Sequence, residues 1–226
     1  MNNIFDENYT SSGFHSQRRY PNTSLISSTF NFLNSKSPSD KKNTNILELG
    51  CGSGANIWMF AKEGYNCYGI DFSKEGIKLC HKMLENWEVK AHIKVGDILK
   101  LDFENNFFDV VYDVVTIQHL NFSEHIQCLN EAYNVLKKGG LFFSYHLSER
   151  SISFKSSTDF IDHCTISNIN PPYPLHNNGK TCFISSNEYR KMLADCGFHK
   201  INIETEQRSY ENGTQLIEYL VVTAVK

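Results

Sequence analysis

The sequence has no segment in which positive charge is concentrated. Its 226 residues include 22 Lys and Arg against 25 Asp and Glu, which gives a formal net charge of −3. Adjacent basic residues occur as pairs such as Arg18-Arg19, Lys41-Lys42 and Lys137-Lys138. Proteins that bind phosphate backbones tightly gather Lys and Arg on one surface or along one segment. The charge distribution therefore argues against nucleic acid as a partner.

The sequence also lacks a long hydrophobic run. Its longest apolar stretches, such as Leu220-Val221-Val222, fall far short of the roughly 20 residues that a membrane-spanning helix requires. The first ten residues carry Asp6 and Glu7, where a signal peptide would have positive charge followed by an apolar segment. We therefore expect no membrane association and a cytoplasmic location.

Paired cysteines are missing as well. The chain has seven cysteines, an odd number, and no CxxC motif, so reduced thiols fit better than a disulfide framework. His163 and Cys164 are adjacent, but no second pair of ligands follows at the spacing typical of a zinc site. The spacing therefore predicts no metal.

Strand-like and helix-like segments alternate from residue 45 to residue 147. Short apolar runs such as NILELG, CYGID and FDVVYDVVTI are separated by longer helix-like stretches. This alternation is typical of βα units that build a parallel sheet. Apolar residues recur three or four positions apart from Phe122 to Lys137, which predicts a helix with one buried face that stops at Gly139-Gly140.

The C-terminal region has a different pattern. A helix is expected from Ser186 to Cys196, and two β-rich segments follow, INIETEQRSY and TQLIEYLVVTAV. Glu211-Asn212-Gly213 lies between them, and Asn-Gly is a strong hairpin signal. The length suits a single domain spanning 1–226. We predict an α/β fold with a doubly wound, mostly parallel, seven-stranded sheet that a C-terminal antiparallel hairpin completes.

Two segments do not follow this alternation. Residues 148–182 come after the fifth strand and show no sustained periodicity. A loop of that length in a compact domain is usually functional or disordered, and we interpret it as a lid-like insertion. Residues 1–35 are interpreted as an N-terminal cap. The residues of these two segments that we expect to contact a substrate are Tyr9, Tyr20, Tyr173 and His176.

The most specific motif is Glu48-Leu49-Gly50-Cys51-Gly52-Ser53-Gly54. A strand that runs into alternating glycines and then a helix lets the backbone approach a ligand at the carboxyl end of the strand. The spacing G-x-G-x-G differs from the G-x-G-x-x-G of dinucleotide-binding turns.

Acidic residues also lie at the ends of the next two strands. Asp71 ends the second strand, where a carboxylate can accept hydrogen bonds from both hydroxyls of a ribose. This position alone also fits an NAD site. Asp97 follows the third strand, where it can accept a hydrogen bond from an adenine amino group while Ile98 packs on the ring.

The ordered set ILELGCGSG, GID, GDI, FDVVYDVVTIQHL and LKKGGLFF closely resembles class I S-adenosylmethionine-dependent methyltransferases. The resemblance covers residues 44–147 by motif and 185–226 by architecture. It implies that S-adenosylmethionine is the cofactor, and Arg19 of the cap can pair with the carboxylate of that molecule. The cofactor-binding residues expected on this basis are Arg19, Glu48, Gly50, Gly52, Gly54, Asp71, Phe72, Asp97, Ile98 and Asp113.

The family chemistry sets the requirements for the methyl acceptor. A hydroxyl must lose its proton as it attacks the methyl group, whereas an amine depends less on a base. Imidazole titrates near neutral pH. The candidate bases are His119 in the loop after the fourth strand, His146 at the end of the fifth, and His176 in the insertion.

Enclosure by a cap and an insertion favours a small-molecule acceptor, such as a sugar or another metabolite, methylated on O or N. Three alternatives stay open: a tRNA-modifying methyltransferase, a non-catalytic protein that retains the cofactor fold, and an NAD-binding oxidoreductase. We expect a monomer or a homodimer.

Overall fold

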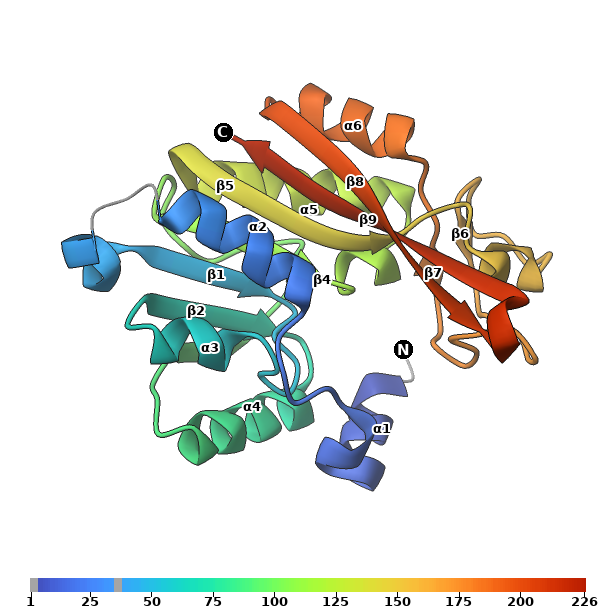
Figure 1. The fold of residues 1–226 in the computed structure, drawn as a ribbon, viewed down its shortest axis with the longest axis horizontal. Helices are drawn as coiled ribbons and strands as arrows, with labels where there is room; N and C mark the ends of the chain where they lie inside the picture. The colour runs from blue at the N-terminus through green and yellow to red at the C-terminus, as the bar shows by residue number, and fades with distance from the viewer. Residues whose placement is uncertain (1–3, 35–37) are drawn as a thin grey trace.

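The computed structural model describes residues 4–34 and 38–226, in which a seven-stranded sheet carries helices on both faces (Figure 1). The strands lie in the order β3-β2-β1-β4-β5-β9-β8. Their bounds are β1 (Asn45–Leu49), β2 (Asn66–Asp71), β3 (His92–Val95), β4 (Phe108–Val114), β5 (Leu136–Leu147), β8 (His199–Tyr210) and β9 (Gln215–Val225). β1 to β5 are parallel, whereas β9 pairs antiparallel with both β5 and β8. The predicted fold class is confirmed.

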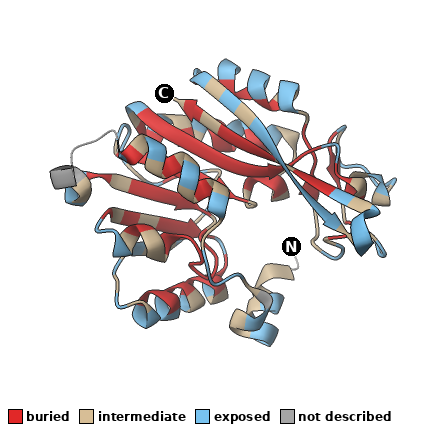
Figure 2. Ribbon diagram, in the orientation of Figure 1, coloured by how far each residue is buried: buried red, intermediate tan, exposed pale blue. Residues whose placement is uncertain are grey.

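The helices bury one apolar core on each face of the sheet. α2 (Thr23–Leu33), α3 (Ile57–Lys62) and α4 (Lys74–Asn86) contribute to one core, and α5 (Phe122–Val135) and α6 (Ser186–Asp195) to the other. β4 is buried along its whole length because both of its faces are covered, and Figure 2 shows burial concentrated in the central strands. Within residues 4–34 and 38–226, no helix is long and apolar enough to cross a membrane.

α5 begins at a capping box that the sequence encodes. The Asn121 side chain accepts a hydrogen bond from the Glu124 backbone N–H, and the Glu124 carboxylate accepts one from the Asn121 N–H. The helix ends earlier than predicted because Leu136 already pairs with β4. The prediction that it continues to Lys137 and stops at Gly139-Gly140 was wrong, since these residues lie inside β5.

The C-terminal hairpin is confirmed at the predicted turn. Tyr210 of β8 pairs with Gln215 of β9, and the short 3-10 turn η5 (Glu211–Gly213) connects them. Asn212 and Gly213 have φ of 55° and 90°, a conformation that suits Asn and Gly. The hairpin extends past the end of the parallel strands toward the insertion (Figure 1).

The insertion, residues 148–182, has some structure of its own. It contains the 3-10 turn η4 (Ile152–Ser156) and a two-stranded sheet of β6 (Thr165–Ile166) and β7 (Thr181–Cys182). A small apolar core joins the insertion to β5 and β9, and its buried members are Leu147, Ile166, Ile169, Phe183 and Ile217. Opening and closing of this segment as a lid stays a prediction.

The N-terminal segment divides into two parts. α1 (Ile4–Ser12) and the turn η1 (Gly13–Ser16) lie apart from the sheet, and α1 packs on α4 with a hydrogen bond from the Ser73 hydroxyl to the Asp6 carboxylate (Figure 1). α2 packs on the sheet instead, and η2 (Pro38–Asn43) leads into β1. The cap predicted for residues 1–35 therefore comprises α1 and the segment up to α2. Residues 1–3 and 35 lie outside the described residues.

Candidate functional site

The alternating glycines form a turn at the carboxyl end of β1. Gly50 and Gly52 have φ of 68° and 46°, a region that residues with a Cβ rarely adopt. The N–H groups of Gly50 and Cys51 donate to one carbonyl of β2, at 2.8 and 3.1 Å. A Cβ at Gly54 would lie 2.9 Å from the Cys80 sulfur of α4. Gly54 therefore allows close packing of α4, whereas Gly50 and Gly52 shape the cavity described below.

Asp71 lies beside this turn, at the end of β2. Its Oδ2 accepts a hydrogen bond from the Gly52 N–H at 2.8 Å, and its Oδ1 accepts one from the Ser73 N–H at 2.8 Å. Burial raises the pKa of Asp71 above its ordinary value, and these two hydrogen bonds oppose that rise. Carboxylate oxygens have further lone pairs, so Asp71 can still accept hydrogen bonds from hydroxyl groups.

Glu48, inside β1, is buried below the turn. Its Oε1 accepts a hydrogen bond from the Asn56 side chain at 2.7 Å, and its Oε2 accepts one from the Tyr112 hydroxyl at 2.9 Å. Burial raises the pKa of Glu48 to about 8, although these hydrogen bonds and the nearby Arg18 favour the charged form. Glu48 therefore links β1 to β4 through Tyr112 and positions the Asn56 side chain, which lines the cavity described below.

A cavity of about 340 Å³ lies over the turn. The glycine turn, Glu48, Asp71 and Phe72 form one wall. The other wall comes from the cap, from the loop after β4 and from the insertion, and its residues include Phe5, Tyr9, Arg18, Thr116, Gln118, His119 and Asn178. Strand ends and two irregular segments thus meet around one space.

The cap helix α1 lies across this cavity. The Phe5 ring meets the His119 ring edge-on at 4.8 Å and the Phe72 ring at 6.2 Å between centroids. The Tyr9 hydroxyl faces the glycine turn, because a Cβ on Gly52 would lie 2.5 Å from it. Burial, with the carboxylate of Asp71 nearby, raises the pKa of Tyr9. Tyr9 therefore stays a neutral hydroxyl at physiological pH.

His119, predicted as a base, lines the cavity from the loop after β4. Its Nδ1 lies 2.9 Å from the carbonyl oxygen of Lys180, just before β7. A carbonyl oxygen only accepts, so Nδ1 carries the proton and Nε2 keeps a lone pair. Burial lowers the pKa of His119 to about 4. The imidazole is therefore neutral near pH 7, and its Nε2 atom, which lies 3.5 Å from the side-chain nitrogen of Gln118, is the basic one.

Gln118, beside His119, has an unused acceptor. Its side chain is 2% exposed and lines the cavity. Among the described residues, no donor reaches the Gln118 Oε1 atom. Buried polar atoms without a partner are rare in folded proteins, so this oxygen marks a position where a ligand N–H or O–H fits.

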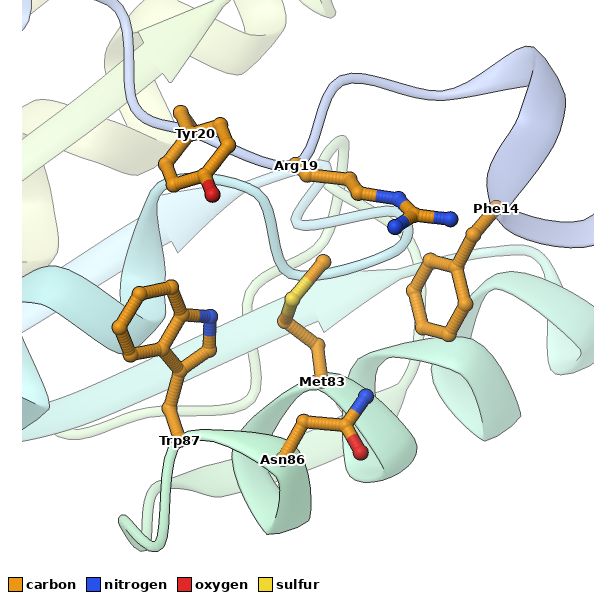
Figure 3. Close-up of a pocket in the computed structure, with 6 residues that line it drawn as sticks. All are labelled: Phe14, Arg19, Tyr20, Met83, Asn86 and Trp87. Atoms are coloured by element: carbon orange, nitrogen blue, oxygen red, sulfur yellow. The ribbon is translucent and has the colours of Figure 1, made fainter.

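Arg19 and Tyr20, predicted to contact cofactor and substrate, line a different pocket of about 300 Å³ (Figure 3). Tyr20 lies edge-on to Trp58 and Trp87, and Figure 3 shows Arg19 between Tyr20 and the ring of Phe14. Arg18 lines the main cavity instead. Neighbouring residues of an extended segment point to opposite sides, which explains why Arg18 and Arg19 line different pockets.

Five of the predicted cofactor residues do not line the cavity: Arg19, Gly54, Asp97, Ile98 and Asp113. Asp97 is exposed, and its Oδ1 accepts a hydrogen bond from the Leu99 N–H at 2.8 Å, while Ile98 packs against the core. Asp113 is fully buried and accepts hydrogen bonds from the Thr116 and Ile117 N–H groups and from a β5 hydroxyl. Asp113 therefore holds the loop after β4, and its expected cofactor contact is corrected to this positioning role. A contact of Asp97 and Ile98 with adenine stays a prediction.

His146, the second predicted base, is fully buried and lies outside the cavity lining. Its ring packs against His125 and Tyr189, because this side chain of β5 points into the core under α5 and α6. Tyr173 packs on the small core of the insertion, and His176 is exposed. The expected substrate contacts of Tyr173 and His176 and the expected base role of His146 are therefore not supported by this geometry.

Several lining residues could not be predicted from the sequence. Phe5, Arg18 and Asn178 lie in segments without periodicity, and only the fold brings them to the cavity. Gln118 belongs to the motif FDVVYDVVTIQHL, but nothing in the sequence marks it as a lining residue. Side chains in irregular segments have no pattern that reveals their direction.

Comparison with known proteins agrees with this geometry. Residues 47–144 match the family model described as a methyltransferase domain. That segment runs from β1 through the glycine turn, Asp71 and the loop after β4 to the middle of β5. It stops before the insertion and does not include the cap.

Two curated relatives match part of this chain. Norajmaline N-methyltransferase of Rauvolfia serpentina is 29% identical over 132 residues, which is 57% of this chain and 44% of that enzyme. The ubiquinone biosynthesis O-methyltransferase of Pelagibacter ubique is 29% identical over 120 residues, 51% of this chain and 48% of that enzyme. The matched part spans less than half the length of both relatives.

The fold is shared more widely. A SAM-dependent methyltransferase from Methanosarcina mazei aligns with a TM-score of 0.70 at 19% identity, covering 86% of this chain and 96% of that one. The strand order, the glycine turn and the family match agree with one another. Residues 47–144 are thus similar to a methyltransferase domain, and the fold of the chain resembles that of a solved SAM-dependent methyltransferase.

Proposed function

We propose that this protein transfers a methyl group from S-adenosylmethionine to an oxygen or nitrogen atom of a small molecule. The observation that carries the proposal is the cavity of about 340 Å³ in which the glycine turn, Asp71 and a neutral His119 face one space. Ligands of open α/β sheets bind at the carboxyl ends of the strands, and the volume lies in the range of small-molecule sites.

The lining residues fit the functional groups of this cofactor. Asp71 has free lone pairs for the two ribose hydroxyls, and the glycine turn leaves the space that a Cβ would fill. Arg18 offers a guanidinium to the cofactor's carboxylate, and the unpartnered Oε1 of Gln118 offers an acceptor to its ammonium group. When bound, S-adenosylmethionine supplies an electrophilic methyl group on a sulfonium.

His119 has the protonation state that a hydroxyl acceptor needs. Nε2 keeps its lone pair because the Lys180 carbonyl holds the proton at Nδ1. A hydroxyl placed against Nε2 can lose its proton to the imidazole as the oxygen attacks the methyl carbon. An amine acceptor would need from this wall only orientation and the exclusion of water.

The cap and the insertion enclose the cavity, which favours a small-molecule methyl acceptor over RNA. Phe5 and Tyr9 of α1 cover the cavity and Asn178 of the insertion borders it, so a folded nucleic acid would have to displace the cap. The negative net charge points the same way. One relative is named an N-methyltransferase and the other an O-methyltransferase, which supports either atom. The free thiols of all seven cysteines support a reducing compartment, and we include a cytoplasmic location in the proposal.

Calorimetry and labelled methyl transfer test this proposal. We expect S-adenosylhomocysteine to bind at a 1:1 ratio, and we expect label from S-adenosylmethionine to enter a component of a small-molecule metabolite extract and not total tRNA. Labelling of tRNA would overturn the acceptor class. Tight NADH binding with no affinity for either sulfur cofactor would overturn the reaction.

A further inference from the structure

Two histidines and a cysteine form a buried cluster outside the lining of the cavity. His125 of α5, His146 of β5 and Cys182 of β7 are each fully buried. One ligand atom from each lies within 4.8 Å of the others. These residues come from three separate elements and are far apart in the sequence, and neither the cavity nor the proposed reaction uses them.

The hydrogen bonds of the two histidines fix their tautomers. The His125 Nδ1 atom lies 3.0 Å from the Asn121 carbonyl oxygen, and the His146 Nδ1 atom lies 2.8 Å from the Leu147 carbonyl oxygen. Because carbonyl oxygens only accept, both Nδ1 atoms carry protons. In the neutral state both Nε2 atoms then present lone pairs, and these atoms are 2.8 Å apart. Two lone pairs at that distance repel each other unless a cation lies between them.

The cation is either a proton or a metal ion, and the surroundings favour the metal. The Cys182 sulfur provides a third donor, and the Cys164 sulfur lies 3.4 Å from it. Two imidazoles with one or two thiolates are a donor set typical of Zn²⁺.

We propose that His125, His146 and Cys182 bind a Zn²⁺ ion. Zn–N bonds of about 2.0–2.1 Å at a tetrahedral angle require the two Nε2 atoms to lie about 3.3 Å apart, so the pair opens by about half an ångström on binding. The carbonyl partners at both Nδ1 atoms are the usual second contacts of zinc-bound histidine. The Cys182 thiol releases its proton to solvent when it binds.

The position of the site indicates a structural role. The two histidines belong to the sheet and its covering helix, whereas Cys182 belongs to the insertion. A bound ion would therefore fasten β7 to the core. Lys180, whose carbonyl holds His119, lies two residues before Cys182. The ion would fix the strand that orients His119 without touching the cavity.

Metal analysis of the full chain tests this proposal. The protein is purified without an affinity tag, dialysed against micromolar Zn²⁺ and measured by mass spectrometry for bound metal. We expect about one equivalent per chain. We also expect a thiolate-to-cobalt charge-transfer band and intense d–d bands after Co²⁺ exchange, which are diagnostic of tetrahedral thiolate ligation.

Buried-cysteine variants provide matched comparisons. Cys182→Ala should lose the bound metal, whereas Cys128→Ala, at another fully buried cysteine one turn from His125 on α5, should keep it. His163→Ala tests a competing group, because Asp162, His163 and Cys164 also lie within ligand distance of one another. Metal retained in Cys182→Ala but lost in His163→Ala would overturn the assignment.

If Cys182→Ala fails to fold, the cobalt spectrum and the zinc content of the wild-type chain still test the site. Absence of a thiolate-to-cobalt band and of stoichiometric zinc in the wild-type chain would overturn the site. The His125–His146 pair would in that case share a proton. Either result is obtained without measuring methyl transfer, so it is independent of the proposed reaction.

Discussion

The two walls of the cavity are built in different ways. The first wall, the glycine turn with Asp71, consists of strand ends held by backbone hydrogen bonds, such as those from Gly50 and Cys51 to β2. The second wall is held by side chains: Phe5 on His119, and Ser73 on Asp6. A wall of strand ends cannot move without breaking the sheet, whereas a helix held by a few side chains can open.

The family match follows the same division. Residues 47–144 contain the first wall and the loop after β4 but neither the cap nor the insertion. The shared part of the family thus corresponds to the proposed cofactor side. The cap and the insertion, which lie outside the match, border the cavity from the other side. We therefore expect substitutions of Gly50 and Asp71 in the first wall to alter cofactor affinity and substitution of His119 in the second wall to alter turnover, whereas Arg18 of the cap contributes to cofactor affinity from the second wall.

The largest expected effect lies in the second wall. If the acceptor is a hydroxyl, His119→Ala should lower turnover by roughly 10²- to 10⁴-fold, because the acceptor would lose its base. The affinity for S-adenosylhomocysteine should change little. His176→Ala, at an exposed histidine outside the cavity lining, is the matched control and should keep full turnover. Steady-state kinetics with calorimetry separates the two quantities.

The pH dependence of turnover tests the role of His119 as the base. Burial lowers the pKa of His119 to about 4, so the imidazole stays neutral as the pH falls from 8 to 5 and gains a proton only near 4. An exposed histidine acting as base would lose activity near pH 6.5. Loss of turnover with a midpoint near pH 6.5 in the wild-type chain, or full turnover in His119→Ala with a hydroxyl acceptor, would contradict the proposed role.

The first wall should respond most strongly to an added side chain at Gly50. A Cβ there would overlap the Thr116 side chain, and φ is already 68°. Overpacking of this kind costs about 1–3 kcal/mol, so Gly50→Ala should weaken cofactor binding by roughly 10- to 100-fold. Gly64→Ala has a similarly positive φ of 91° but open space around it, and it should bind the cofactor normally. Equal losses in both variants would mean that backbone strain, and not the cavity, is responsible.

The contrast between the walls also explains what the sequence could predict. β1, β2 and β4 are apolar runs between turn residues, so their ends, and with them Asp71 and the glycine turn, could be located from spacing alone. The hairpin could be located as well, because Asn-Gly is a strong hairpin signal. In the structure φ is positive at both Asn212 and Gly213. Regular elements carry a period that the sequence displays.

The remaining site residues could not be located because nothing periodic determines their direction. Arg18 and Arg19 are adjacent in an extended segment, and only the packing of α1 and η1 decides which one enters the cavity. His146 ends a central strand as predicted, but its side chain points to the face that α5 covers. The His125, His146 and Cys182 cluster was missed because its ligands have no local zinc spacing.

Cofactor affinity should also distinguish the two strand-end aspartates, Asp71 and Asp97. Asp71→Asn removes the charge that the ribose hydroxyls would donate to, and a hydrogen bond to a charged group contributes about 1.5–3 kcal/mol. Cofactor affinity should therefore fall by roughly 10- to 100-fold. Asp97→Asn should have a clearly weaker effect, because Asp97 is exposed and already bonded to the Leu99 N–H. Calorimetric titration of S-adenosylhomocysteine into both variants checks the order, and an equal loss would place Asp97 on the cofactor.

The smallest expected change in cofactor affinity concerns the neighbouring residues Arg18 and Arg19. Arg18 lines the cavity and Arg19 lines the pocket with Phe14 and Trp87. Arg18 is exposed at the rim, so its pairing with the cofactor's carboxylate is screened by solvent and should contribute about 1 kcal/mol. Arg18→Ala should weaken S-adenosylhomocysteine binding by roughly fivefold, and the loss should shrink as salt is added.

Arg19→Ala serves as the control because it removes the same charge one residue away. Its binding of S-adenosylhomocysteine should match the wild type at every salt concentration. A larger loss in Arg19→Ala than in Arg18→Ala would mean that the cap turns over when the cofactor binds and brings the other face of the segment into the cavity. Methylthioadenosine, which lacks the carboxylate, should bind both variants equally, because only the carboxylate distinguishes a guanidinium at the rim from one outside it.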